Sequence, residues 1–150
     1  FFGGGLHQST HGAFLDVHVD FNIHPETGFH RRLNLILYFN KNWKPEYEGK
    51  LELWDMTKKT RLENYSPNFN RCVIFETNEY SYHGHPKPLN TPPGTTRKSM
   101  ALYYYTKDRS ANEIVASHNT RYVNTSGFAG VVKNISSSIK ALKERILRNE

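Results

Sequence analysis

Apolar and polar residues alternate along most of the chain, and this two-residue period is that of β-strands. The longest such run covers residues 32–40, which read Arg-Leu-Asn-Leu-Ile-Leu-Tyr-Phe-Asn. One face carries leucines, and the other carries Asn34, Ile36 and Tyr38. Because both faces are largely apolar, we expect this strand to be covered on both sides. Asn34 and Tyr38 would then point into an enclosed space, where their polar groups need hydrogen-bond partners.

Shorter runs of the same kind predict further strands, separated by turn residues. They cover residues 13–21, 51–55, 71–76, 80–84 and 97–106. The glycine-rich residues 3–12 predict a loop, the polar residues 57–70 predict a hairpin, and the proline-rich residues 85–94 predict another loop. Six or more strands with no alternating helices favour a mainly β fold, a sandwich or jelly roll, over residues 1–126.

The period changes near residue 127, and residues 127–150 predict an amphipathic helix. Its apolar stripe has the spacing of a single helix face and consists of Ile135, Ile139, Leu142 and Ile146. Five basic and two acidic residues in this segment supply half of the chain's net charge of +6. We expect the helix to pack on the core or on a partner subunit. Nucleic-acid binding by this basic segment is a weaker alternative.

Composition and length are those of one globular domain. The chain has 150 residues, of which 37% are hydrophobic and 13% aromatic, and it has no apolar run long enough to span a membrane. Cys72 is the only cysteine, which excludes an internal disulfide and favours a reducing, cytoplasmic location. The chain begins at Phe1 without a methionine or a signal pattern, so we expect a further segment upstream.

The candidate chemistry begins with His18 and Asp20 in the first predicted strand. Two residues apart, they project from the same face, roughly 7 Å apart along the strand, while Val17 and Val19 face the other way. An imidazole and a carboxylate on one strand are two of the three ligands of the 2-His-1-carboxylate triad that binds ferrous iron. The pair alone does not establish a metal site, because the chain has eight histidines.

His83 is the candidate third ligand, at the end of a later predicted strand and next to Gly84. His85 would lie on the same face and is the alternative. We favour His83 because Pro86 follows His85 directly, where strand geometry is expected to end. The loop histidines His24 and His30 are weaker candidates.

Arg97 and Ser99 share the inward face of the predicted strand 97–106, whereas Lys98 faces outward. A guanidinium beside a hydroxyl suits the bidentate capture of a carboxylate, and a buried arginine requires an anion. Arg31 and Arg32, which lie near the ligand strand, are open to two interpretations: contact with a substrate or ordinary surface charge.

The order His18-x-Asp20, His83, Arg97 resembles the iron(II)- and 2-oxoglutarate-dependent dioxygenases, in particular their prolyl-4-hydroxylase-like branch. The resemblance covers residues 12–106 and extends to the segments 30–43, 49–54 and 97–105. It implies a double-stranded β-helix, or jelly roll, with flanking helices. It also implies His18, Asp20 and His83 as iron ligands, and Arg97, assisted by Ser99 and Tyr38, as the site for the distal carboxylate of 2-oxoglutarate.

The activity implied by the resemblance is hydroxylation of a C–H bond in a peptidyl proline, an amino acid or a small metabolite, with release of succinate and CO2. Ascorbate is a further candidate cofactor, and nucleic acid is not an expected partner. One alternative is a jelly-roll module that binds a sugar or nucleic acid without turnover. Another is a cupin-like zinc or manganese enzyme, which would need His85 as a fourth ligand.

Overall fold

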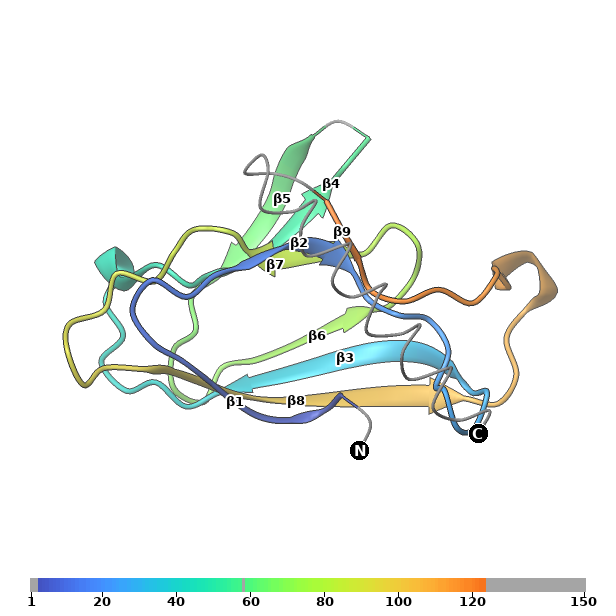
Figure 1. Cartoon of the computed structure of the whole chain (residues 1–150), viewed down its shortest axis with the longest axis horizontal. Coiled ribbons are helices and arrows are strands. Elements are labelled where there is room, and N and C mark those ends of the chain that lie inside the picture. Colours follow the sequence, from blue (N-terminus) through green and yellow to red (C-terminus); the bar gives the residue numbers. More distant parts are fainter. Residues whose placement is uncertain (1–2, 58, 124–150) are drawn as a thin grey trace, which may run out of the picture.

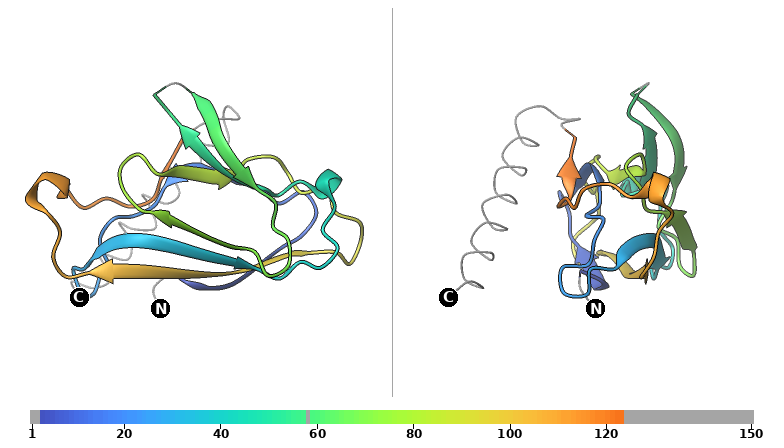
Figure 2. Two further views of the ribbon diagram at one scale, coloured as in Figure 1. Left: turned by 180° about the vertical axis from the view of Figure 1, so that it is seen from behind. Right: turned by 90° about the vertical axis from the view of Figure 1, so that its right-hand side faces the viewer.

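The computed structural model describes residues 3–57 and 59–123, and in this part of the chain the fold is mainly β. Two antiparallel sheets lie one above the other, as Figures 1 and 2 show from three directions. Their strands are β1 (Gly5–Ser9), β2 (Leu15–Val19), β3 (His30–Tyr38), β4 (Leu51–Asp55), β5 (Thr60–Tyr65), β6 (Cys72–Glu76), β7 (Tyr82–His85), β8 (Arg97–Thr106) and β9 (Arg121–Tyr122).

Strands distant in sequence are neighbours within each sheet. One sheet has the order β1-β8-β3-β6 and the other has the order β5-β4-β7-β2-β9. The first is built on the long pair of β3 and β8, whose register places Tyr38 opposite Ser99. The second pairs β2 with β7, which brings the beginning of the chain next to a strand more than sixty residues later. The predicted mainly β fold is confirmed.

The inner faces of the two sheets form the core. Tyr38, Leu51 and Val73 are its buried centre, and Ile36, Tyr65 and Phe75 pack against them. Asn34 and Tyr38 point inward and are almost completely buried, as the alternation of β3 predicts. The opposite face of β3 is different, because Leu33 is 38% exposed in the structure. The prediction that β3 is covered on both faces therefore holds for the inner face and is wrong for the outer face at Leu33.

Two strands lie where the sequence predicts none. The glycine-rich segment expected to be a loop contains β1, which pairs with the edge of β8. The segment after β8, which has no clear periodicity, contributes β9, a short strand at the edge of the second sheet. In both cases the pairing partner is remote in sequence, so local propensity carries little signal.

The described residues include two short 3-10 segments, Pro45–Tyr47 and Ala111–Glu113, and no α-helix. The predicted flanking helices therefore have no counterpart in this part of the chain. The helix predicted over residues 127–150 lies outside the described residues, and the proposed division into a core and a terminal helix stays a prediction. No helix within the described ranges has the length and apolar character that crossing a membrane requires.

Candidate functional site

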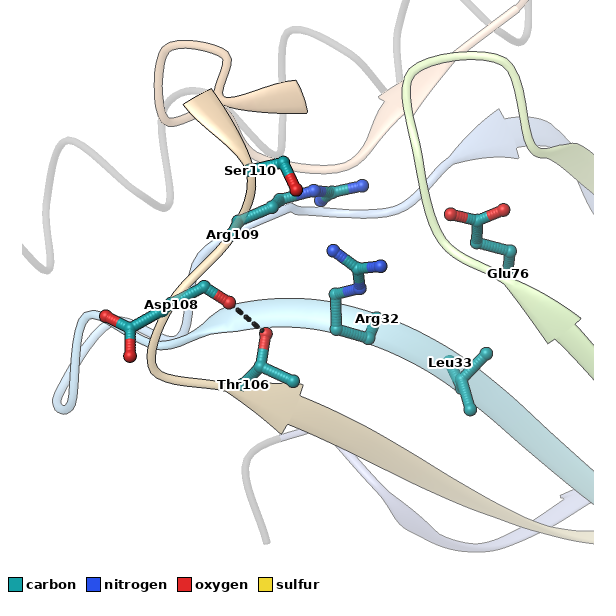
Figure 3. A pocket seen from close by; sticks show the side chains of 7 residues that line it. All are labelled: Arg32, Leu33, Glu76, Thr106, Asp108, Arg109 and Ser110. Atoms are coloured by element: carbon teal, nitrogen blue, oxygen red, sulfur yellow. Dashed lines mark hydrogen bonds between the residues drawn. The ribbon is translucent and has the colours of Figure 1, made fainter. Parts of the chain in front are cut away.

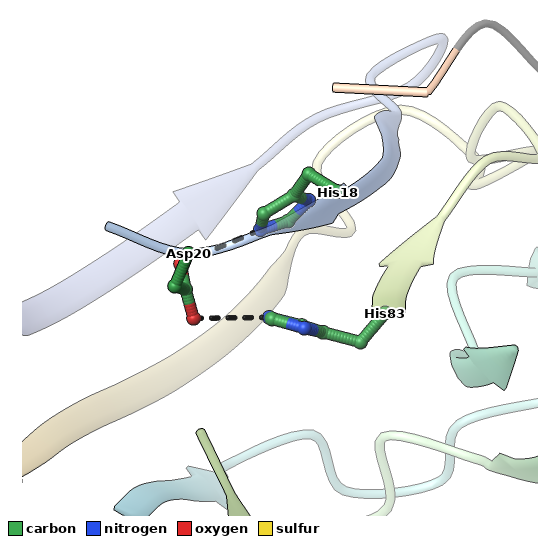
Figure 4. Close-up of side chains that lie close together, drawn as sticks. All are labelled: His18, Asp20 and His83. Atoms are coloured by element: carbon green, nitrogen blue, oxygen red, sulfur yellow. Dashed lines mark ion pairs between the residues drawn. The ribbon is translucent and has the colours of Figure 1, made fainter. Parts of the chain in front are cut away.

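Strand pairing brings the two predicted histidine ligands together. In the antiparallel register of β2 and β7, His18 lies directly opposite His83, and their ring centroids are 4.4 Å apart. Asp20 follows β2 and turns its carboxylate toward both rings, as Figure 4 shows. Asp20 Oδ1 lies 3.6 Å from His18 Nε2, and Asp20 Oδ2 lies 3.4 Å from His83 Nε2. One candidate ligand atom from each residue lies within 4.8 Å of the other two.

Hydrogen bonds to the backbone orient both imidazoles. His18 Nδ1 lies 2.8 Å from the carbonyl oxygen of Asp16, and His83 Nδ1 lies 2.9 Å from that of Ser81. Because a carbonyl oxygen only accepts, each Nδ1 carries the proton and donates it. The lone pair is then on Nε2, the atom that faces Asp20, which is the usual arrangement of a metal-binding histidine.

The charges in this cluster favour the deprotonated forms that metals bind. Burial lowers the pKa of His83 to about 4, and the neighbouring His18 contributes in the same direction, so the His83 ring is neutral near pH 7. Burial alone would raise the pKa of Asp20. The neighbouring His18, His83 and Arg31 outweigh this effect and hold the pKa of Asp20 below its usual range. Two neutral imidazoles and one carboxylate are the donor set that suits ferrous iron.

The other histidines are not part of this cluster. β7 continues through His85, which is buried and lines the same cavity, so the expectation that strand geometry ends before His85 is wrong. Among the described residues, the group that could hold a metal contains His83 and not His85. His24 Nδ1 instead faces the backbone N–H groups of Glu26 and Thr27, at 3.3 and 3.4 Å. The structure thus gives no support to a fourth histidine ligand.

A buried arginine marks a second part of the site. Arg97, at the start of β8, is 7% exposed, and Ser99 beside it is 3% exposed. The Arg97 guanidinium donates to the carbonyl oxygen of Gly49 at 2.8 Å and to Tyr38 Oη at 3.3 Å. In the ranges that the structure describes, no carboxylate forms an ion pair with Arg97. Because a buried cation is costly without an anion, this guanidinium is suited to a ligand carboxylate.

Gly49 permits this approach of Arg97. Its φ of +72° is in the left-handed region, and a Cβ atom there would lie 2.4 Å from Leu89 Cδ2 and 3.0 Å from Arg97 Cδ. Any larger residue would therefore have to displace both side chains. Burial lowers the pKa of Arg97 and raises that of Tyr38, while contact between the two opposes both shifts.

One cavity of about 270 Å³ connects the two parts. Its lining contains the whole metal-binding group together with Arg97 and Ser99. β1 adds His7 and Ser9 to the wall, which the sequence did not predict because that segment lacks strand periodicity. A small molecule with a carboxylate at one end could contact Arg97 and still reach the metal ligands.

The site also contains a polar network that sequence reasoning missed. Arg31 is fully buried, and its Nη2 donates to Asp20 Oδ2 at 3.0 Å. Asn34 Nδ2 donates to the same oxygen at 2.7 Å. The inward position of Asn34 was expected from the alternation of β3, but its partner was not. For Arg31, the interpretation as surface charge is wrong, because its side chain is buried.

Comparisons with known proteins give the family of the chain and a similar fold. The family model of the 2OG-Fe(II) oxygenase superfamily matches residues 4–105. A prolyl-4-hydroxylase of Pseudomonas putida has a similar structure, with a TM-score of 0.52 and 18% identity over 70% of this chain and 52% of that one. A prolyl 4-hydroxylase structure from Phytophthora capsici matches with a TM-score of 0.48 and 20% identity over 65% of this chain and 30% of that one.

The chain thus spans about half the length, or less, of these two proteins. No curated protein sequence matches the chain. At 18% identity, the likeness to the Pseudomonas enzyme concerns the fold alone.

Proposed function

The chain belongs to the 2OG-Fe(II) oxygenase superfamily, and on this premise we propose that it hydroxylates a C–H bond of a peptide or small-molecule substrate. The cofactors of the superfamily are iron(II) and 2-oxoglutarate. In the proposed reaction, one oxygen atom of O2 enters the C–H bond to give an alcohol. The other enters 2-oxoglutarate, which loses CO2 and becomes succinate. The two-sheet arrangement supports an interpretation of the fold as a double-stranded β-helix.

The observation that supports this proposal best is that one cavity contains both the candidate iron ligands and a buried arginine suited to a carboxylate. His18 Nε2, His83 Nε2 and the Asp20 carboxylate would hold the iron, whose role when bound is to supply the oxidative chemistry. Arg97 would bind the distal carboxylate of 2-oxoglutarate in a bidentate manner, with Ser99 beside it. Tyr38 Oη accepts from Arg97, so its own proton can be donated to the same carboxylate.

The chain's contribution to the reaction is then mainly positioning. The carbonyl groups of Asp16 and Ser81 keep both Nε2 atoms directed at the metal position. Arg97 fixes the far end of the cosubstrate, so that its 2-oxo acid end is presented to the three ligands. The three ligand side chains and Arg97 are buried, which limits the access of water to them.

For the substrate, we propose a peptidyl proline, an amino acid or another small metabolite. The fold likeness to a prolyl-4-hydroxylase makes a peptidyl proline the first to test. The single cysteine supports a cytoplasmic location.

The test is release of succinate from 2-oxoglutarate by the purified protein with added iron(II), under air and with candidate substrates. Asp20→Ala should reduce this release to background, because it removes the anionic ligand. Asp108→Ala is the matched control, since Asp108 lies in a separate pocket and should leave turnover unchanged. Equal turnover in Asp20→Ala and the wild type would refute the assignment. Wild-type protein that binds neither iron nor 2-oxoglutarate would instead favour a non-catalytic binding module.

A further inference from the structure

The two oxygens of the Asp20 carboxylate have different surroundings. Oδ2 accepts hydrogen bonds from Arg31 Nη2 at 3.0 Å and from Asn34 Nδ2 at 2.7 Å. Oδ1 has neither of these donors. Each oxygen also faces one imidazole, since Oδ1 lies 3.6 Å from His18 Nε2 and Oδ2 lies 3.4 Å from His83 Nε2. Since a carboxylate oxygen has two lone pairs in its plane, these two donors engage both lone pairs of Oδ2.

The Arg31 side chain is fixed on several sides. It is 1% exposed, and its guanidinium lies over the ring of Tyr103, with 3.5 Å from Cζ to the ring centroid. The Phe21 ring lies 4.6 Å from the same atom. Arg31 Nε and Nη2 also donate to Asn34 Oδ1 at 2.9 and 2.7 Å. A guanidinium held by two rings and an amide has little freedom to leave Oδ2.

These contacts also settle the orientation of the Asn34 amide. Arginine can only donate, so the oxygen of Asn34 must face Arg31 and its nitrogen must face Asp20. Thr77 Oγ1 lies 3.4 Å from the same Asn34 oxygen. A reversed amide would place a donor against the guanidinium and an acceptor against the carboxylate. Only one orientation of the Asn34 amide therefore satisfies the hydrogen bonds with both Arg31 and Asp20.

We propose that Arg31 and Asn34 are positioning residues that engage Oδ2 of Asp20, so that Asp20 binds the metal through Oδ1 alone. This inference rests on the proposed function, because it presupposes metal binding by His18, Asp20 and His83. Both hydrogen bonds withdraw electron density from Oδ2 and hold the carboxylate plane. Binding through one oxygen uses three coordination positions for the protein and leaves the others for a chelating cosubstrate.

The neighbouring Arg32 provides a matched control. It has the same charge and lies on the same strand, but its Nη1 donates to Glu113 Oε2 at 2.9 Å. Figure 3 shows its side chain beside that of Arg109, in the pocket that also contains Asp108. The strand pairing has a register shift between Arg31 and Leu33, and the two arginine side chains point to different partners. Replacing Arg32 thus removes a cation from the protein without removing a donor to Asp20.

The test measures Co(II) binding to the metal-free protein by calorimetry, together with the visible absorption spectrum of the Co(II) form. Arg31→Met and Asn34→Leu should each weaken Co(II) binding about 10- to 100-fold, the usual effect of losing a partner of a metal ligand. Their spectra should change, because a released carboxylate alters the coordination of the metal. Arg31→Lys, which keeps one donor, should give an intermediate affinity. Arg32→Met should remain within about twofold of the wild type.

Three other outcomes are informative. Unchanged Co(II) affinity and spectrum in both Arg31→Met and Asn34→Leu would overturn the inference, even if both variants were less stable to heat. If Arg31→Met does not fold, Asn34→Leu decides alone, because it keeps the cation and removes only the amide. Wild-type protein that binds no Co(II) would refute the proposed function itself, and the inference with it.

Discussion

Arg97 offers the sharpest prediction, because its partner in the proposed function is a ligand rather than a residue. Arg97→Leu removes a buried guanidinium that we expect to bind a carboxylate through two hydrogen bonds. A hydrogen bond to a charged group contributes about 1.5–3 kcal/mol, so losing the pair should cost about 3–6 kcal/mol. The affinity for 2-oxoglutarate should therefore fall about 100- to 20,000-fold.

The stability of the free protein should respond very differently. Arg97→Leu leaves the carbonyl oxygen of Gly49 without its donor, which costs about 1–3 kcal/mol. It also removes a buried cation that has no carboxylate partner among the described residues. Removing this cation stabilises the folded protein and so opposes the cost of the lost hydrogen bond. The free energy of unfolding without ligand should thus change by no more than about 2 kcal/mol.

The assay compares KM for 2-oxoglutarate, from succinate release, with urea unfolding of the same protein without ligand. Lys98→Met is the control, because Lys98 is the next residue on β8 and is exposed. Arg97→Lys should be intermediate, since an ammonium keeps the charge but loses the bidentate geometry. A KM for 2-oxoglutarate within threefold of the wild type in Arg97→Leu would refute the assignment of this pocket.

Three further outcomes are expected. As the pH falls from about 6.5 to about 4, the metal-free protein should lose up to about 3 kcal/mol of stability through His83, because only its unfolded form takes up a proton there. This loss should be absent from the corresponding urea curves of His83→Asn. Gly49→Ala should destabilise the protein by about 1–3 kcal/mol and raise KM for 2-oxoglutarate, since a Cβ at this positive φ would meet Leu89 and Arg97. His85→Ala should retain Co(II) binding within about threefold in calorimetry, whereas His83→Ala should abolish it; the reverse result would exchange their roles.

The placement of several candidate site residues could be predicted from sequence, because it depends on strand parity. Arg97 and Ser99 share a face because alternate residues of a strand do so, and this rule needs no knowledge of the partner strand. His18 lies on β2, and Asp20, which follows β2 directly, continues on the same side as His18. The choice of His83 over His85 is different. Both lie on β7 and both are buried, and only the register with β2, which places His83 opposite His18, separates them.

The networks around the ligands could not be predicted, because they depend on a local irregularity. Arg31 and Arg32 are adjacent and chemically identical, and the regular alternation of β3 assigns neither a partner. The register shift between Arg31 and Leu33 turns one arginine to Asp20 and leaves the other for Glu113. Such a shift results from the pairing of β3 with β8, which short-range patterns do not encode.

Arg31 and Arg97 are both buried, but they differ in their partners, and this difference indicates different roles. Arg31 has a carboxylate partner within the chain, Asp20, so its burial is compensated before any ligand arrives. Arg97 is buried to a similar degree, but its described contacts are a carbonyl and a hydroxyl, which compensate the charge only in part. The first arginine is therefore suited to fixing a metal ligand, and the second to attracting an anion. Removing Arg31 should accordingly destabilise the metal-free protein more than removing Arg97, because it leaves the buried carboxylate of Asp20 without its arginine partner.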